Sequence, residues 1–314
     1  MASAERGIEY LDRRLNEAVI RDEQIDWQRY LNPDDKARII PAEALAEEAK
    51  RRILLGPDSE EGLTLPWENT KGRVFMKAGK LMLWAGWSRH GKTQMLKQVM
   101  LHAIKEGHKP LICSMEEEVI EVWRDMACIA CLSLEPSPRD LNKYTKFVQG
   151  NLWLYDQQGR VAPKKLLALI RYAADELKIT QCMVDSLMML AIDRDDYAAQ
   201  AGFVAELKTV AKDTGVTVHL VAHMRKRDGK GGEDQPGGLH DIAGGQEIGA
   251  MVDSVFIPWR NVADLTAPSA LKVDKQRGRV NWMGTLKMNY HAESRQFVDD
   301  VHPMRFLSDE PQDF

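Results

Sequence analysis

The pattern of apolar and polar residues divides the chain near residue 70. Residues 1–70 are rich in Glu, Arg and Ala, and turn-forming residues interrupt their apolar stretches. Only 41–55 has the spacing of an amphipathic helix, with a proline in its first turn and Gly56 after its end. Its apolar positions are Ala44, Leu45, Ala49 and Ile53. So few apolar residues cannot form a core, so we predict a helical extension that docks on another surface.

From residue 80 onward, short apolar runs alternate with helical stretches. The runs typical of strands are KLMLWAG, KPLICSM, NLWLYD, TQCMVDSL and VTVHLVA, and the helical stretches are 93–106, 117–134, 164–177 and 197–213. Apolar strands separated by helices are typical of a mostly parallel sheet that is covered on both faces. After residue 253 the runs SVFIPW, LKVDK and GTLKMNY predict a hairpin-rich edge.

These patterns predict an α/β fold with three parts: a helical extension over 1–70, one large domain over 71–300 and an acidic tail over 301–314. The net charge is −4, so a contact with nucleic acid requires a local basic cluster. No apolar run approaches the roughly 20 residues that span a bilayer. The first residues, MASAERGIEYLDRR, lack the apolar core of a secretory signal. We therefore expect a cytoplasmic protein without a membrane partner.

One segment carries a complete phosphate-binding pattern. Residues 86–93, GWSRHGKT, fit G-x-x-x-x-G-K-[ST] between a strand-like run and a helical stretch. In such a loop, which here includes Gly86, Ser88 and Gly91, backbone N–H groups and the start of the helix surround the phosphates. Lys92 is expected to reach the β- and γ-phosphates, and the Thr93 hydroxyl to hold magnesium. The segment predicts that ATP, or another nucleoside triphosphate, binds with Mg²⁺.

Two acidic positions extend this prediction. Asp185 ends the apolar run QCMVD, which places a carboxylate beside the phosphate loop, where it can hold magnesium through water. Ser186 follows instead of a glutamate, so the base that activates water must come from another segment. Glu116, in SMEEE after the next strand-like run, is the candidate for that base. Glu117 and Glu118 remain alternatives, and one of the three can simply cap the next helix.

The four cysteines do not predict a metal site. Cys128 and Cys131 form a CxxC, but no second Cys or His pair lies nearby to complete four zinc ligands. Their surroundings, WRDMACIACLSL, have helical spacing, which favours thiols that pack as small hydrophobic groups. We expect no zinc ribbon in this sequence.

Six segments, in this order, resemble the hexameric replicative helicases of the DnaB and Twinkle type. They are GWSRHGKT, SMEE, MVDSL, LVAHM, DIAGGQEIGAMVDSVFIPWR and KQRGRVNWMGTLKMNY. The resemblance covers roughly residues 72–298. They look like the versions in bacteriophage helicases that lack a primase domain, which would place the protein in a host cytoplasm. The resemblance implies a RecA-like P-loop ATPase that forms a homo-oligomeric ring, a hexamer, around single-stranded DNA. Such a ring unwinds duplex DNA in the 5′ to 3′ direction.

The resemblance also implies roles for individual residues. His223 matches the position that senses the γ-phosphate. Lys275 and Arg277 match the basic pair that a neighbouring subunit inserts into the ATP site, where a cation stabilises charge on the γ-phosphoryl group. Arg260 and Tyr290 match the positions on the two sides of adenine. The alternative for each of these residues is a solvated group at a strand end or on a hairpin.

A DNA contact is expected within 224–250. The basic residues of its first part are Arg225, Lys226, Arg227 and Lys230. Five glycines within 229–238 favour a flexible loop that follows a phosphate backbone rather than reading bases. Three acidic residues dilute its charge, so a solvated loop is the alternative. The stretch 241–246 resembles the second channel loop of the family, but Ala243 replaces an arginine found in other members, which leaves its contacts open.

The end of the chain predicts a tail. Residues 299–314 hold five acids against one arginine and end on Phe314. Such a segment is poorly suited to packing. It resembles the acidic, aromatic-ended tails with which phage helicases and single-strand-binding proteins contact a DNA polymerase or other replication proteins. A solvated tail without a partner is the alternative.

Two other functions use the same ATP loop and magnesium acid. One is a RecA-like recombination or annealing ATPase, and the other is a loader or regulatory protein that uses ATP as a switch. The pair Lys275 and Arg277 and the position of Glu116 favour the helicase over the first. A site with both a base and a trans arginine argues against the second.

Overall fold

A computed structural model describes residues 19–31, 42–55, 62–157, 159–225, 233–242, 245–278, 281–300 and 302–307. The chain divides into two compact units, Met1–Ala37 and Arg38–Phe314. The described part of the first unit contains η1 (Asp22–Gln24) and α2 (Trp27–Leu31). The second unit contains every site considered below. No helix in the described ranges is long and apolar enough to cross a bilayer.

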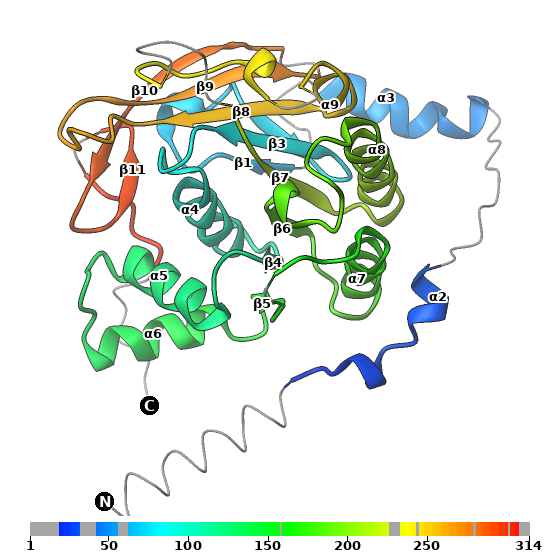
Figure 1. The fold of residues 1–314 in the computed structure, drawn as a ribbon, viewed down its shortest axis with the longest axis horizontal. Helices are drawn as coiled ribbons and strands as arrows, with labels where there is room; N and C mark the ends of the chain where they lie inside the picture. The colour runs from blue at the N-terminus through cyan, green and yellow to red at the C-terminus, as the bar shows by residue number, and fades with distance from the viewer. Residues whose placement is uncertain are drawn as a thin grey trace, which may run out of the picture. The chain divides into compact units, whose positions relative to one another are not determined.

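A nine-stranded sheet forms the centre of the second unit (Figure 1). Its strands are β3 (Leu81–Gly86), β4 (Pro110–Ser114), β5 (Trp153–Leu154), β6 (Gln181–Asp185), β7 (Thr217–His223), β8 (Ser254–Trp259), β9 (Ser269–Gln276), β10 (Gly284–His291) and β11 (Gln296–Val298). The spatial order is β11-β10-β9-β8-β3-β7-β6-β4-β5. Strands β8 to β5 in this order pair in parallel, and β9, β10 and β11 add to the edge in antiparallel pairs. The predicted mostly parallel sheet with a hairpin-rich edge is confirmed.

Helices cover both faces of the parallel strands. They are α4 (Lys92–Lys105), α5 (Val119–Cys131), α6 (Pro138–Val148), α7 (Pro163–Glu176), α8 (Tyr197–Thr214) and α9 (Gly245–Met251). Figure 1 shows α4, α5 and α6 on one side of the central strands and α7 and α8 on the other. The parallel pairing of β3 with β7 and of β7 with β6 places the carboxyl ends of these strands together, which is where sheets of this kind bind ligands.

The central strands are joined by a polar contact inside the core. His219 on β7 is fully buried, accepts a hydrogen bond from Trp84 Nε1 at 3.1 Å and contacts Gln181 Oε1 through Nε2 at 2.9 Å. Burial lowers the pKa of His219 to about 3, so the ring is neutral at physiological pH. A neutral imidazole with one donor and one acceptor satisfies both neighbours, which fixes the tautomer.

The segment before β3 packs on the large unit. It contains β1 (Gly62–Thr64), η4 (Glu68–Thr70) and β2 (Phe75–Lys77), and β1 and β2 form a separate two-stranded sheet. Trp67 is buried and donates its indole N–H to Phe297 O at 2.7 Å. Asn69 N donates to Asp299 Oδ2 at 2.8 Å. Residues 62–77 therefore share the core of the large unit.

The helix predicted over 41–55 is confirmed as η2 (Ala42–Leu45) followed by α3 (Ala46–Leu55). Three of its apolar side chains are exposed: Leu45 by 52%, Ile53 by 67% and Leu54 by 85%. Burial of these exposed apolar side chains against another surface would be favourable, because it removes apolar area from water. Docking of this side on another surface stays a prediction.

The end of the chain packs more than its composition indicates. Phe306 is buried, and Gln296 binds Met304 twice, as acceptor from its N–H at 2.8 Å and as donor to its carbonyl at 3.0 Å. The expectation that the whole of 299–314 is poorly suited to packing is wrong for residues 302–307, because apolar residues among the acids reach the core. Residues 308–314, with Phe314, lie outside the described residues.

Candidate nucleotide-binding site

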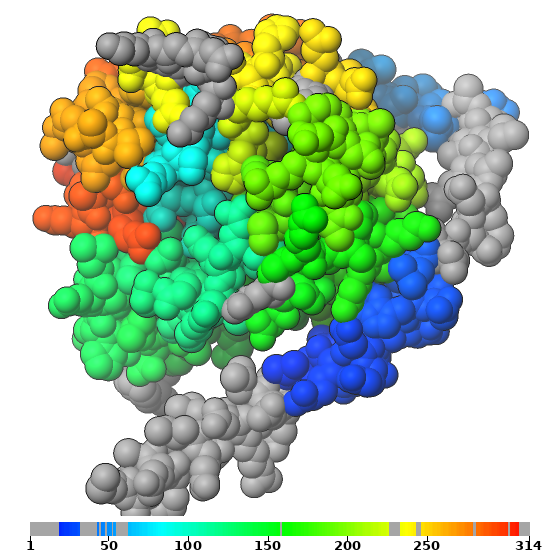
Figure 2. All heavy atoms as spheres, viewed as in Figure 1, coloured from blue at the N-terminus to red at the C-terminus, as the bar shows by residue number. Residues whose placement is uncertain are grey.

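The phosphate loop connects β3 to α4. Its glycine before the lysine, Gly91, has φ +90 and lies so close to Phe297 that a Cβ atom would come within 2.4 Å of the ring. Both the positive φ and this approach require glycine. Ser88 in the loop is exposed. In Figure 2 the cyan surface around the loop faces the viewer, between the orange residues that follow β8 and the green residues of the helical side. A ligand can therefore reach the loop.

Lys92 is buried at the start of α4. Its Nζ donates to Trp87 O at 2.9 Å and lies 3.4 Å from His223 Nδ1. Burial lowers its pKa to about 8, against the raising effect of the Asp185 and Glu116 carboxylates. A bound polyphosphate would add negative charge beside the ammonium group and raise this pKa again. Lys92 is therefore placed as a cation that a phosphate can recruit from a backbone carbonyl.

Thr93 and Asp185 meet beside this lysine. The Thr93 hydroxyl donates to Asp185 Oδ2 at 2.6 Å, and burial raises the pKa of Asp185 to about 6. A hydroxyl and a carboxylate oxygen suit Mg²⁺, which keeps several waters and takes few protein ligands when it binds a nucleotide. In the described part of the chain, no three His, Cys, Asp or Glu side chains gather into a metal site. The two residues fit a magnesium ion held jointly with phosphates and water.

Glu116 reaches the same place from a more distant strand. It follows β4, which β7 and β6 separate from β3 in the sheet. Ser186 Oγ donates to Glu116 Oε1 at 2.6 Å, and His223 Nε2 lies 3.6 Å from the same oxygen. Hydrogen bonding to His223 lowers the pKa of Glu116 to about 2, although burial opposes this, and Ser186 and Lys92 also lower it. The carboxylate is therefore ionised, and anionic phosphates nearby would raise its basicity.

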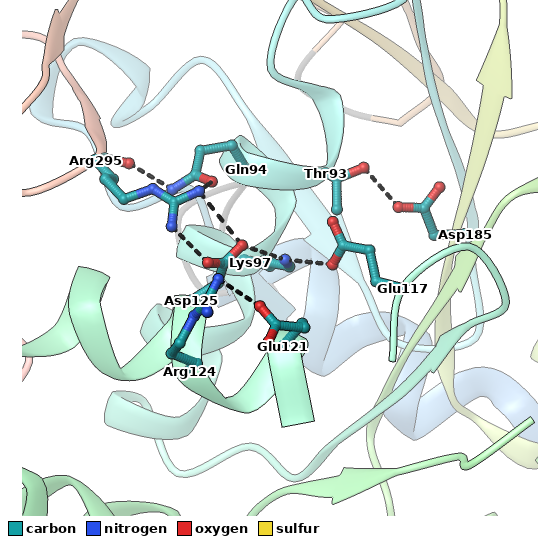
Figure 3. A network of polar contacts seen from close by, with 9 residues as sticks. All are labelled: Thr93, Gln94, Lys97, Glu117, Glu121, Arg124, Asp125, Asp185 and Arg295. Atoms are coloured by element: carbon teal, nitrogen blue, oxygen red, sulfur yellow. Dashed lines mark hydrogen bonds and ion pairs between the residues drawn. The ribbon is translucent and has the colours of Figure 1, made fainter. Parts of the chain in front are cut away.

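The two neighbouring glutamates have other contacts. Lys97 Nζ on α4 binds Glu117 Oε2 at 2.5 Å, as Figure 3 shows. Glu118 is the residue before α5 and takes the N-cap position. Of the three acids in SMEEE, Glu116 is the one that contacts both His223 and Ser186 among the described residues. This geometry favours Glu116 as the base.

Lys97 is the centre of a buried ion network. Its side chain is 1% exposed and also binds Asp125 Oδ2 on α5 at 3.0 Å. Asp125 in turn binds Arg295 Nη1 at 2.5 Å, and Gln94 Nε2 on α4 donates to Arg295 O at 2.7 Å. Figure 3 shows these side chains converging from α4, α5 and the turn between β10 and β11. The network fixes the phosphate-loop helix to the segment that carries the candidate base.

The expected adenine pair lies beside the phosphate loop. The Arg260 guanidinium group stacks over the Tyr290 ring with its carbon 4.7 Å from the ring centre, and Arg260 Nε donates to Arg89 O at 3.1 Å. The two residues thus contact each other, and a base between them would have to separate them. Their role stays a prediction.

Lys275 and Arg277 lie at the carboxyl end of α9. Lys275 Nζ contacts Gly249 O, and Arg277 Nη2 donates to Ala250 O at 2.6 Å. Burial, with the nearby Arg277 charge, lowers the pKa of Lys275 to about 8. Across the described ranges, no contact joins either side chain to the phosphate loop of its own chain. This placement is compatible with a role in a neighbouring subunit.

Arg225 is the expected DNA contact that the structure describes. Its guanidinium carbon lies 4.5 Å from the centre of the Tyr197 ring, at the start of α8. Lys226, Arg227, Lys230 and Ala243 lie outside the described residues. The CxxC cysteines, Cys128 and Cys131, are free thiols on α5, the first buried and the second partly buried.

The roles of two residues in the site were not predicted from the sequence. Ser186 was noted because it is not glutamate, but its hydroxyl is the donor that fixes Glu116. Lys97 interrupts the apolar side of α4 between Leu96 and Val99, and a lysine at an inward position is a signal for buried carboxylate partners.

Comparisons with known proteins identify the family and the fold. The family model described as "ATPase: KaiC" matches residues 69–279. A solved structure described as an ATPase domain superposes with a TM-score of 0.66 and 17% identity, over 84% of this chain and 99% of that chain. A structure described as "The Structure Of A DnaB-Like Replicative Helicase And Its Interactions With Primase" superposes with a TM-score of 0.65 and 16% identity, over 85% of this chain and 68% of that chain. No curated protein matches in sequence. The predicted RecA-like fold is confirmed.

Proposed function

The chain belongs to the KaiC family of ATPases, and on this premise we propose that it is the motor of a replicative DNA helicase. It hydrolyses ATP with Mg²⁺, moves along single-stranded DNA and unwinds duplex DNA as a homo-oligomeric ring, a hexamer. The observation that carries the proposal is the convergence of Lys92, the Thr93–Asp185 pair and Glu116 at the carboxyl ends of three strands.

The reaction is hydrolysis of the terminal phosphoanhydride. A water attacks the γ-phosphorus, the bond to the β-phosphate oxygen breaks, and ADP and inorganic phosphate leave. Glu116, held by Ser186 and His223, accepts a proton from the water, and Lys92 binds the phosphate oxygens. The magnesium ion would neutralise phosphate charge when held by Thr93 and Asp185. Positioning and charge supply most of the catalysis in such a reaction.

A ring explains the place of Arg277. The site in one chain holds one described cation, Lys92, close to the candidate base, and transition-state charge on the γ-phosphoryl group calls for another. Lys275 lies near the end of β9, an inner strand of the sheet, and Arg277 directly follows this strand. Among the described residues, their side chains bind only the carbonyls of α9. In the proposed ring they enter the ATP site of the next subunit.

DNA contact is assigned to the basic segment that follows β7, of which Arg225 is described. Backbone contact by arginine and lysine is insensitive to base sequence and depends on salt. The acidic tail, residues 308–314, is assigned to a DNA polymerase or another replication protein, by its resemblance to such tails.

The test is ATP hydrolysis with and without oligothymidylate. A strong increase in turnover, which weakens as salt is raised, supports the helicase motor. An ATP turnover that single-stranded DNA does not change supports the loader or switch protein instead. Stimulation together with annealing of complementary strands supports the recombination-type ATPase.

A further inference from the structure

Two tryptophans lie between the nucleotide site and the segment that follows the basic loop. Trp87 is the second residue of the phosphate loop and is buried; its Nε1 donates to Gln235 O at 3.2 Å. Trp259 is the last residue of β8, and β3 separates β8 from β7 in the sheet. The Trp259 Nε1 donates to Glu233 O at 2.8 Å. Both indole N–H groups therefore donate hydrogen bonds to backbone carbonyls within residues 233–235.

Trp259 also contacts the phosphate loop directly. Its ring lies 6.2 Å from the ring of His90, at an angle of 34°. His90 is buried in the loop, and its Nδ1 has no hydrogen-bond partner in the part of the chain that the structure describes. Trp259 thus touches the nucleotide loop with its ring and the segment after the basic loop with its N–H group.

The start of the basic segment is joined to the same loop. Met224 N, directly after β7, donates to Gly86 O at 3.1 Å, and Gly86 is the first residue of the phosphate loop. Arg225 N then donates to Asp241 O at 2.8 Å. A Cβ on Gly237 would come within 2.4 Å of Met224 Sδ, so the two sides of the segment are in close contact.

Residues 233–242 are also fixed from the far side. Lys272 Nζ on β9 donates to Gly237 O at 3.1 Å, and Asp274 Oδ2 accepts from Leu239 N at 2.9 Å. A segment held on both sides transmits displacement instead of absorbing it, because packed and hydrogen-bonded elements shift between discrete arrangements. Residues 224–225 and 233–242, on the two sides of the basic loop, are therefore joined to the phosphate loop.

From these contacts we infer that Trp259 is a positioning residue that couples the ATP site to DNA, with the indole N–H to Glu233 O as the link and Trp87 as a parallel link. The inference rests on the proposed function. Coupling between two sites is reciprocal, so DNA changes ATP turnover and nucleotide changes DNA affinity through the same contacts. Trp259 has no contact with the candidate base or the magnesium residues among the described residues.

The test replaces the donor and keeps an aromatic ring. In Trp259→Phe the ring remains beside His90 and the N–H is lost, which removes one neutral hydrogen bond, worth roughly 2- to 10-fold in an equilibrium. The matched control is Trp123→Phe, because Trp123 on α5 packs edge-on against Tyr144 and its N–H has no partner in the described ranges. Trp259→Tyr, which also lacks the indole N–H, serves if the first variant does not fold.

Three quantities are measured on the full chain: basal ATPase, ATPase with saturating oligothymidylate, and affinity for fluorescein-labelled oligothymidylate with and without a non-hydrolysable ATP analogue. We expect Trp259→Phe to keep basal turnover and to lose several-fold of both the DNA stimulation and the analogue-induced gain in DNA affinity, while Trp123→Phe behaves as wild type. Equal stimulation in Trp259→Phe and wild type overturns the coupling and leaves the helicase proposal intact. If Trp259→Phe loses basal turnover as much as DNA stimulation, the coupling role is also overturned, because Trp259 would then act on the ATP site itself. A wild-type protein that DNA does not stimulate overturns the proposed function.

Discussion

At the scale of residues, a substitution at Glu116 tests the proposed proton transfer. Glu116→Gln keeps the shape of the side chain and removes its ability to accept a proton, so we expect ATP to bind and turnover to fall by about 10²–10⁴. Lys92→Ala removes the phosphate cation, so both binding and turnover should be lost. The control is Glu121→Gln, the same change on α5 at a partly exposed carboxylate that pairs with Arg124.

Binding of a fluorescent ATP analogue measures the affinity of each pure variant for nucleotide, and phosphate release measures its turnover. Near-normal turnover in Glu116→Gln, with a large loss in Glu117→Gln or Glu118→Gln, would move the base to that residue.

Lys97 gives a prediction about stability instead of chemistry. Lys97→Met leaves Glu117 without its cation and Asp125 with Arg295 alone. Removal of one partner from a buried ion pair costs about 3–5 kcal/mol of the free energy of unfolding, and the remaining arginine should keep this loss near the lower value. The control, Lys71→Met, breaks an exposed pair with Glu68 and should change stability by less than about 0.5 kcal/mol.

Urea unfolding followed by circular dichroism compares the two lysine variants. Equal stability of Lys97→Met and Lys71→Met would mean that the network of Figure 3 does not hold α4, α5 and the β10–β11 turn together.

The residues of the phosphate loop could be predicted because they are contiguous and each has its own geometric reason. Gly91 needs its positive φ, and Lys92 follows it in the first turn of α4. Ser186 and Lys97 could not be assigned in this way, because their roles depend on partners far along the chain. Glu116 lies 70 residues from Ser186, and Asp125 lies 28 residues from Lys97.

At the scale of elements, strands and helices with strong periodicity were predicted within a few residues. The helical stretch 117–134 is shorter in the structure, because Leu132 has φ +59 and ends α5. The helix α6 was not predicted, although Ser137 caps it by accepting from Asp140 N and Pro138 begins it. Its apolar residues recur at helical spacing and pack on the core, so the sequence did contain a signal for this helix: Leu141, Tyr144, Phe147 and Val148.

The exposed side of α3 carries a prediction about assembly. Ile53 and Leu54 are largely exposed in one chain, and a ring supplies identical neighbours that can cover them. Ile53→Asp with Leu54→Asp in the full chain should shift the protein toward smaller species and weaken its DNA-stimulated ATPase. Lys50→Gln on the same helix is the control, since it breaks only an exposed pair with Glu47.

Sedimentation velocity at low protein concentration distinguishes the outcomes. Rings of unchanged size in the double aspartate variant would show that α3 does not hold subunits together.

At the scale of the whole molecule, we expect the ATP sites to be shared between chains. Arg277→Ala and Lys92→Ala should each inactivate a homogeneous ring. Mixed rings should regain activity, because an intact loop in one subunit meets an intact arginine from the next at about one quarter of the interfaces. Phosphate release from mixed samples, with mixing shown by differently labelled subunits, measures this recovery.

Absence of recovery in rings shown to be mixed would place Arg277 in its own site or outside catalysis. In that case its bond to Ala250 O would be a helix-end contact only.

Unwinding of DNA by this motor is measured by strand displacement. A forked duplex with a labelled strand is mixed with the protein, ATP and Mg²⁺, and the released strand is measured over time. We expect displacement by the wild-type protein when ATP is present and none by Glu116→Gln. Hydrolysis of ATP on single-stranded DNA without any displacement of the labelled strand would show that the protein is not a helicase motor.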